Sequence, residues 1–427
     1  MRAALRQILF ADPMPWAYKA PYAWDFLNNK ARFAGANAGA LANTPGWSFA
    51  RASTGYAQNS SGVLVPFSSG QLRRTDKGVL IEGARTNLCL QSQTFDNASW
   101  TKTRSSVSAD AAVAPDGTTT ADKLVEDNSN NTHWTSSAAI TITADSTFTV
   151  SAYFKDGGRW ARLAGIDATE TNYFGAYFNP STGSFGSNQT GGTGSVTAKG
   201  VTALANGWYF VWITGTVGSG VTTVKSVVKL SSADLTQSYS GDGTSGLYLW
   251  GAQLEAASFP SSYIPTTSAS ATRAADVLTV PVSGIDCPLS LYAEFERAID
   301  TGGTETLVQI DSGSAANRSI FSVESTDKLD IAVTSASAGQ GAVEPNVTLT
   351  AGSAVRKGAC RVGTNTIQAA VGGTLGTEDT SCTVPATPTT LRFGCVSSGV
   401  GQPFGYLRRA ALWTRALSDA ELQSVTT

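Results

Sequence analysis

The chain has 427 residues, long enough for two or three domains, and its ten tryptophans and 17 phenylalanines exclude a disordered chain. The formal net charge of −2 excludes a general electrostatic attraction to nucleic acid. Only 15% of the residues are charged and 43 are glycine, a composition that predicts an all-β chain with many turns.

Residues 1–85 differ from the rest in charge and pattern. They contain 10 Lys and Arg against 4 Asp and Glu, a net charge of +6, so the remainder carries −8. A short amphipathic patch (Leu5, Ile8, Leu9 and Phe10) ends at Pro13, and a proline-broken aromatic run follows, with Trp16, Tyr18, Tyr22, Trp24 and Phe26. We interpret 1–85 as an irregular segment that docks on another protein. The alternative is a strand and turn that completes the following domain.

Residues 86–272 predict a series of strands. Within 140–157, Phe148, Val150, Ala152 and Phe154 alternate on one face of a strand. The runs GWYFVWITGTV and GLYLWGAQLE are further strands, and the first is apolar on both faces, as expected of a strand covered on both sides. Turn signals such as DGG, NPSTG and GDGTSG separate the runs, and the whole pattern predicts a jelly-roll sandwich.

A Thr/Ser/Ala-rich connector at 266–276 marks a boundary, and nine of the ten tryptophans precede it. Beyond it, seven short strand candidates predict a second sandwich over 273–427. The candidates are LYAEFER, TLVQIDSG, SIFSVE, KLDIAVTS, NVTLTAG, TIQAAVGG and TLRFGCVS. The predicted fold is therefore all-β, with two β-sandwich (jelly-roll) domains at 86–272 and 273–427 that follow an irregular N-terminal attachment segment at 1–85.

The last residues predict a strand followed by a capped helix. The strand carries Trp413, and a helix then begins at Ser418. Ser418 and Glu421 form a capping box, and Leu417 and Leu422 occupy the positions of a hydrophobic staple.

The five cysteines, Cys89, Cys287, Cys360, Cys382 and Cys395, form no CxxC pair and no zinc-like spacing. This predicts reduced thiols in a chain folded in a cytoplasm, with one disulfide among the last three left open. No run approaches the roughly 18 apolar residues of a membrane helix, and the N-terminus lacks the apolar core of a signal peptide. We expect no membrane association, and a protein that acts outside the cell would leave as part of a particle.

Aromatic and polar residues that suit sugar binding gather in TNYFGAYFNPSTG. Flat rings stack on pyranose faces, and amides and guanidinium groups bond the hydroxyls. If Phe174 and Phe178 face the core, Tyr173 and Tyr177 point outward from the other face of the strand. The candidate glycan-binding residues are Tyr173, Tyr177, Asn172, Asn179, Trp160, Arg162 and Trp134. The alternative is that the aromatic residues belong to the core.

The sequence contains few groups of residues that could form a catalytic site. The single histidine, His133, stands in a polar, turn-like run without a GxSxG motif, so we expect a loop histidine. A glycosidase needs two carboxylates, and the local pairs are Asp167 with Glu170 and Glu294 with Glu296. Solvated strand faces are the alternative for both pairs.

Three runs resemble known families. FARAS followed by GVLIEGARTNL, within 48–90, resembles a module common in structural proteins of tailed bacteriophages and phage-like particles, with GVLIEG a buried strand and Arg85 and Asn87 able to bond backbone carbonyls after it. DGTTTADKLVED with LYLWGAQLEAASFPSSYIPTT resembles the carbohydrate-binding-module-like jelly rolls of those proteins, with GAQLE to SYIPT as closing strand and exit loop. Residues 276–427 resemble a concanavalin A-like, laminin-G-type sandwich.

The resemblance implies a structural virion appendage (tail fibre, head fibre or spike) that binds host surface polysaccharide for adsorption and is not an enzyme. It implies contact with other virion proteins through 1–85, a homo-oligomer with a trimer favoured, assembly in the host bacterial cytoplasm and a place on the virion surface. No cofactor is expected, but such jelly rolls often hold a structural Ca²⁺, for which the loop residues Asp116, Asp122 and Asp242 are candidates. A decoration protein without a ligand and a polysaccharide depolymerase are the alternatives.

Overall fold

A computed structural model describes residues 14–17, 19–352 and 354–427. The patch predicted around Leu5 to Phe10, and Tyr18, lie outside the described residues. The all-β class is confirmed, with 52% of the chain in strands and 4% in helices. The chain forms two compact units. Unit 1 comprises the described residues up to Ala52, Ser69–Gly83 and Ala274–Thr427, and unit 2 comprises Ser53–Ser68 and Ala84–Arg273.

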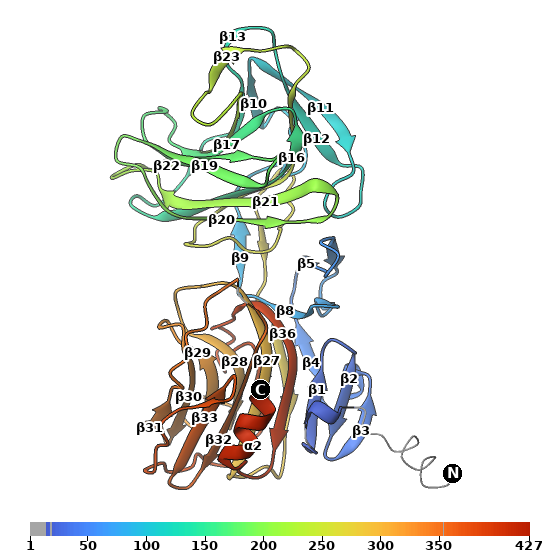
Figure 1. Ribbon diagram of the computed structural model, residues 1–427, viewed down its shortest axis with the longest axis vertical. Coiled ribbons are helices and arrows are strands. Elements are labelled where there is room, and N and C mark those ends of the chain that lie inside the picture. Colours follow the sequence, from blue (N-terminus) through green and yellow to red (C-terminus); the bar gives the residue numbers. More distant parts are fainter. Residues whose placement is uncertain (1–13, 18, 353) are drawn as a thin grey trace, which may run out of the picture. The chain divides into compact units, whose positions relative to one another are not determined.

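Unit 1 is a sandwich of a ten-stranded and a seven-stranded sheet (Figure 1). The strands of the larger sheet are β1 (Tyr22–Asp25), β2 (Lys30–Phe33), β3 (Ala36–Gly39), β7 (Arg74–Thr75), β8 (Gly78–Ile81), β27 (Leu289–Ile299), β32 (Arg356–Gly363), β33 (Thr366–Val371), β34 (Thr374–Leu375) and β36 (Phe404–Trp413). Those of the smaller sheet are β4 (Ser48–Ala50), β26 (Val277–Pro281), β28 (Glu305–Asp311), β29 (Arg318–Val323), β30 (Leu329–Ser335), β31 (Ala338–Val343) and β35 (Thr390–Phe393). The helical elements are η1 (Pro15–Ala17), η2 (Leu41–Asn43) and α2 (Asp419–Thr426). The strand orders are β3-β2-β1-β36-β27-β32-β33-β34, with β8 on β36, and β31-β30-β29-β28-β35-β26-β4.

The N-terminal residues complete unit 1, which corrects the predicted separate segment at 1–85. β1 pairs with β36, so that Trp24 lies opposite Ala410, and β4 pairs with β26. The rings of Trp24 and Phe26 are fully buried, with centroids 5.0 and 5.5 Å from that of Phe393. These aromatic residues therefore belong to a core and are not available to a partner. Residues 53–68 of the same predicted segment belong to unit 2.

Six of the seven strands expected in the second half are present as β27, β28, β29, β30, β33 and β35. The exception is NVTLTAG: Thr348 makes only an isolated bridge with Lys328, and the Leu349 N–H donates to the Asp327 carbonyl. The run therefore lacks a partner strand, although Leu349 is buried. The strand β32, with Arg356, Lys357 and two glycines, was missed because its composition is atypical of a strand.

The terminal helix forms as predicted and lies on the outer face of the larger sheet, against β32 and β33 (Figure 1). The Ser418 hydroxyl accepts from the Glu421 N–H, and the Glu421 carboxylate accepts from the Ser418 N–H. Leu417 and Leu422 are buried in one cluster with Trp413, so that tryptophan packs beneath the helix and not between the sheets. No helix of the described residues is both long and apolar enough to cross a membrane.

Replacing Ser418 with alanine should lower the free energy of unfolding by about 1 kcal/mol, because the first turn of α2 loses its capping acceptor. Urea unfolding followed by tryptophan fluorescence measures this change. Ser424→Ala, in the last turn of the same helix, is the matched control and should change stability by less than about 0.5 kcal/mol. Equal effects of the two substitutions would contradict a role for the cap.

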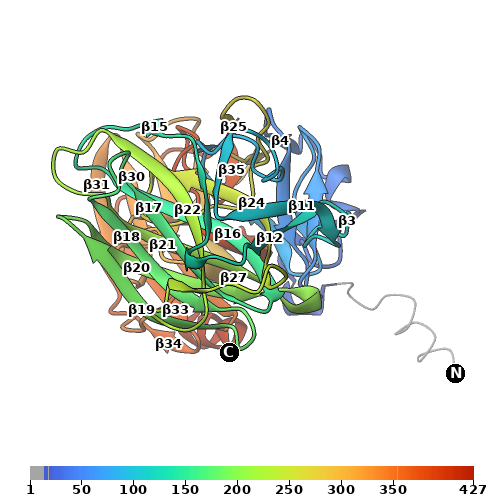
Figure 2. The ribbon, with the colours of Figure 1, turned by 90° about the horizontal axis from the view of Figure 1, so that it is seen from above.

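Unit 2 is a second sandwich. Its seven-stranded sheet contains β10 (Trp100–Thr103), β14 (Trp134–Ser137), β15 (Ile140–Thr141), β17 (Trp160–Ile166), β18 (Tyr173–Asn179), β19 (Ser184–Gly191) and β22 (Thr223–Ser231). Its six-stranded sheet contains β11 (Ser105–Ala112), β12 (Ala121–Glu126), β16 (Thr147–Gly157), β20 (Ser195–Ala203), β21 (Trp208–Thr216) and β24 (Gly246–Glu255). The remaining elements are β5 (Gly55–Gln58), β6 (Leu64–Phe67), β9 (Arg85–Asn87), β13 (Asn130–Thr132), β23 (Ser238–Ser240), β25 (Ala271–Arg273) and η3 (Ala205–Gly207). The sheet orders are β10-β14-β22-β17-β18-β19, with β15 on β22, and β11-β12-β24-β16-β21-β20 (Figure 2).

The core of unit 2 lies between these two sheets. Phe148, Val150, Ala152 and Phe154 of β16 all contribute to it, as their alternation predicts. The outer face of the six-stranded sheet carries a smaller aromatic cluster around Trp250. The hairpin of β5 and β6 and the exit loop after β24 contribute side chains to this cluster, so that strand β21 is covered on both faces as expected.

All five cysteines are free thiols in the structure. Four are buried, and Cys287 is half-buried. Burial raises the pKa of Cys89 to about 12 and that of Cys287 to about 11. Both thiols are therefore weakly reactive near neutral pH.

Candidate ligand-binding face

A row of aromatic and cationic side chains crosses the outer face of the seven-stranded sheet of unit 2. Trp134 of β14 lies opposite Lys229 of β22, Lys229 opposite Arg162 of β17, and Arg162 opposite Tyr177 of β18. The intervening residues, such as Leu163 and Phe178, face the core. Because side chains alternate along a strand, the row points away from the core. We call this surface, with Tyr173, the binding face.

The floor beside this row is made of small side chains. Val227 lies opposite Ala164, and Ala164 lies opposite Gly175. A Cβ at Gly175 would lie 2.7 Å from that of Ala164, so glycine is needed at this close approach. Trp134 and Tyr173 are both half-buried and pack against the cluster of Ala164, Ile166 and Val227. The two aromatic rings thus pack on a strip of small apolar side chains that is itself buried.

A cationic side chain lies over each of the two aromatic rings. The Lys229 Nζ lies 5.2 Å from the Trp134 ring centroid, and the Arg162 guanidinium carbon lies 4.7 Å from that of Tyr173. Burial lowers the pKa of both cations. Sequence reasoning missed Lys229, although the period-two spacing of Lys225, Val227 and Lys229 would place it on the outer face once the core face was assigned.

The predicted outward orientation of both tyrosines is correct in direction, but the expectation that Tyr177 is accessible is wrong. Tyr177 is fully buried, because the loop from Ser232 to Gln237 covers it. Its hydroxyl donates to Gln189 Oε1 at 3.0 Å, and the Gln237 amide donates to the same oxygen at 2.8 Å. The Tyr177 ring therefore cannot stack on a ligand, although it lies beside Arg162 on the outer side of the sheet.

The two asparagines hold loops. The Asn172 amide donates to Asp167 Oδ2 at 2.9 Å, and its oxygen accepts from the Thr193 N–H. Asn179 Oδ1 accepts from the Ser181 N–H in a tight turn. Trp160 is half-buried at the start of β17 on the same outer side as Arg162, beside Asp234 and Gly186. It lies one row beyond Arg162 and Tyr177, at the edge of the face.

The carboxylates and the histidine considered for catalysis have structural partners. The His133 ring is buried, and its Nδ1 lies 2.7 Å from the Arg104 carbonyl oxygen. Asp167 accepts from Thr169, Thr171 and Asn172 within its own loop. Glu294 accepts from Arg408 and Arg409, and Glu296 pairs with Lys77 at 3.1 Å.

The calcium candidates likewise bond protein donors. Asp116 Oδ1 accepts from the Thr118 N–H and hydroxyl, and Asp242 Oδ1 accepts from Thr244 and Ser245. Asp122 accepts from the backbone N–H groups of Phe95 and Asp110. Within 14–17, 19–352 and 354–427, no group of three or more His, Cys, Asp or Glu is placed to hold a metal ion.

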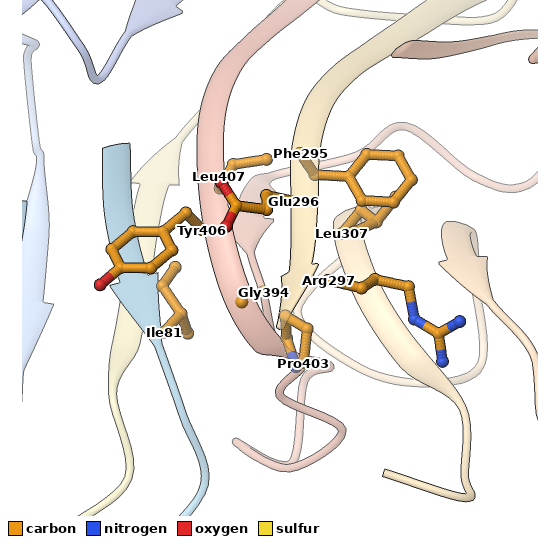
Figure 3. Close-up of a pocket in the computed structure, with 10 residues that line it drawn as sticks. Ile81, Phe295, Glu296, Arg297, Leu307, Gly394, Pro403, Tyr406 and Leu407 are labelled. Carbon is orange, nitrogen blue, oxygen red and sulfur yellow. The ribbon is translucent and has the colours of Figure 1, made fainter. Parts of the chain in front are cut away.

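Unit 1 contains a hollow of about 10 Å³, lined by apolar side chains that include Ile81, Phe295 and Leu307 (Figure 3). This volume holds roughly one water molecule. Arg297 at its edge turns away from Glu296 in Figure 3, and its Nε donates to Glu305 at 2.9 Å. The hollow is therefore too small for a sugar.

No protein-family model and no curated protein sequence matches the chain. The similar solved structures include the CBM40 domain of the Ruminococcus gnavus IT-sialidase bound to alpha2,6 sialyllactose, with 12% identity, 34% of this chain and 84% of that chain covered, and a TM-score of 0.29. Domain 4 of an extracellular arabinanase from Geobacillus stearothermophilus, in complex with arabinotriose, has 12% identity, 40% and 82% coverage and a TM-score of 0.30. Domains LG4-5 of the mouse laminin alpha1 chain have 13% identity, 68% and 90% coverage and a TM-score of 0.23. All three scores are below 0.5, and the assignment of two sandwiches rests on the sheets described above.

Proposed function

We propose that the chain is a non-catalytic carbohydrate-binding appendage of a phage or phage-like particle, and that unit 2 binds host surface polysaccharide through the binding face. The observation that carries this proposal is the pair of half-buried rings, Trp134 and Tyr173, on one apolar strip beside Lys229 and Arg162. The two rings offer apolar contact to one side of a sugar ring, and the cations offer hydrogen-bond donors to its oxygens.

The rigidity of the sheet supports this role. All five residues of the face lie on interior strands of one sheet, where neighbouring strands fix their backbone. Sites built on strands are held more accurately than sites on loops, so little ordering is needed when a ligand binds. Tyr177 lies opposite Arg162 on the same side of the sheet, and its own position is fixed by the hydrogen bond to Gln189.

The appendage role is supported by the resemblance of FARAS to GVLIEGARTNL to phage structural proteins. A single shallow face of this kind gives weak binding, which a homo-oligomer would strengthen by presenting several copies to one polysaccharide. We therefore propose a homo-oligomer, with a trimer favoured, that is held on the virion by other virion proteins.

Replacing Trp134 with alanine should weaken binding to host polysaccharide by about tenfold, because one face of the sugar loses its aromatic contact. Isothermal titration of the purified chain with capsule or lipopolysaccharide fragments measures this change. Tyr248→Ala is the matched control, since Tyr248 also pairs with a lysine, Lys123, at 5.6 Å, but on the outer face of the other sheet. Unchanged affinity in Trp134→Ala, or no saturable binding to any host fraction, would exclude the face as the site. Release of reducing ends from the polysaccharide would instead identify a depolymerase.

A further inference from the structure

We propose that the sugar recognised by the binding face is acidic, and that its carboxylate accepts hydrogen bonds from Arg162 and Lys229. This inference rests on the proposed carbohydrate-binding function and names the class of ligand. The observation behind it is the absence of any anionic partner for these two cations among the described residues.

Arg162 is only 2% exposed, yet its guanidinium makes no hydrogen bond or ion pair with any described residue. Its Nε and Nη2 are buried without an acceptor, its guanidinium lies over the Tyr173 ring, and its neighbours across the sheet are Tyr177 and Lys229. A buried charged donor that lacks a partner is costly, and in native structures such a group commonly marks an absent ion, water or ligand.

Three other buried arginines of this chain form ion pairs with carboxylates. Arg51 and Arg73 pair with Asp276, and Arg297 pairs with Glu305. The fold supplies carboxylates to these three guanidinium groups, and two further buried arginines, Arg32 and Arg273, donate to carbonyl or hydroxyl oxygens. Arg162 differs from all five in having no oxygen acceptor among the described residues.

Lys229 adds a second uncompensated charge. Its ammonium contacts the Trp134 ring and makes no ion pair with a described residue. The nearest acids have other partners, since Asp234 accepts from the Ser187 N–H and hydroxyl, and Glu170 pairs with Lys225 at 3.8 Å. Arg104, the remaining nearby cation, donates to the carbonyl and hydroxyl of Thr132. The face therefore presents two positive charges beside two aromatic rings.

A carboxylate matches this arrangement better than a hydroxyl does. The planar fork of arginine binds the two oxygens of a carboxylate in parallel, and charge-assisted bonds of this kind are roughly twice as strong as neutral ones. A neutral sugar would leave the charge of the buried Arg162 uncompensated. Uronic acids and nonulosonic acids both carry such a carboxylate on a ring that can lie against Trp134.

The test compares oligosaccharides that end in galacturonic, glucuronic or N-acetylneuraminic acid, each with its own methyl ester. We expect at least one acid to bind about tenfold more tightly than its ester, with an affinity that falls as salt is raised. Arg162→Met should remove this preference, so that each acid and its own ester bind to the variant with affinities within about twofold of each other. Lys123→Met, from the matched pair on the other sheet, should change neither affinity.

The melting temperature of the Arg162→Met variant distinguishes a binding role of Arg162 from a structural one. Removal of an uncompensated buried charge should leave the melting temperature of the unliganded Arg162→Met variant unchanged or raised, whereas a purely structural arginine would leave a destabilised chain. Lys229→Met, at a half-buried position, should likewise reduce the preference for the acid over its methyl ester. Host polysaccharide binding without any preference of acid over ester would overturn this inference alone. No binding to polysaccharide, acid or ester would overturn the proposed function as well.

Discussion

Replacing Asp276 with asparagine should lower the free energy of unfolding of unit 1 by about 3–5 kcal/mol. Asp276 is fully buried between two arginines: its Oδ1 accepts from Arg51 Nη1 at 3.1 Å, and its Oδ2 accepts from Arg73 Nη2. Arg73 also donates to Glu82. The asparagine removes the negative charge that both guanidinium groups share, and removal of one partner from a buried ion pair is strongly destabilising.

This cluster also closes the point where the chain leaves unit 1 and returns to it. Unit 1 is interrupted after Gly83 and resumes at Ala274. The Asp276 N–H donates to the Glu82 carbonyl at 2.9 Å, and the Glu82 N–H donates to Asp276 Oδ2 at 2.9 Å. The cluster thus fastens the residue that follows β8 to the residue that precedes β26, 194 residues apart in sequence. It also gives a physical reason for the arginine of FARAS and the glutamate of GVLIEG.

Hydrogen–deuterium exchange of peptides from each unit, with urea unfolding, measures the effect and assigns it to unit 1. Asp300→Asn makes the same chemical change in a partly exposed pair, since the Asp300 side chain is 46% exposed and lies 3.2 Å from Arg297. It should cost less than about 1 kcal/mol. Equal stability of the Asp276 and Asp300 variants would rule out a structural role for the buried cluster.

Local patterns in the sequence predicted local structure well. Phe148 to Phe154 lie on the core face of β16, because the period-two alternation of one strand already specifies which face is apolar. The helix after Ser418 and its staple were likewise predictable, since every group involved lies within five residues of the cap. The same alternation correctly placed Tyr173 and Phe174 on opposite faces of β18.

Features that depend on distant partners could not be predicted. Tyr177 is buried by a loop more than 50 residues later, and nothing in its own strand indicates that cover. Trp24 and Phe26 join a core whose partner strand, β36, is almost 400 residues away, so their irregular surroundings suggested a free arm. For Arg162, the sequence predicted only that it belongs among the candidate glycan-binding residues. Its lack of an anionic partner emerges only when the neighbouring strands are in place.

Replacing Asn87 with alanine should destabilise unit 2 by about 3 kcal/mol, because one buried amide holds four backbone groups. Its nitrogen donates to the carbonyls of Ala252 and Ile264 at 3.0 and 2.9 Å, as the sequence predicted for a residue after the GVLIEG strand. Its oxygen accepts from the N–H groups of Cys89 and Leu254 at 3.0 and 3.2 Å. The same prediction fails for Arg85, whose guanidinium lies over the Phe259 ring at 4.2 Å.

Alanine leaves these four groups without partners in a site that excludes water, whereas Asn179→Ala removes a single hydrogen bond from a turn and should cost less than about 1 kcal/mol. Thermal unfolding of the two variants provides the comparison, and exchange of β9 and β24 peptides assigns any loss to the connection between those strands. If Asn87→Ala were no less stable than Asn179→Ala, the amide would not hold the closing strand and exit loop together. In that case β24 would depend on its ladder with β12 and β16 alone.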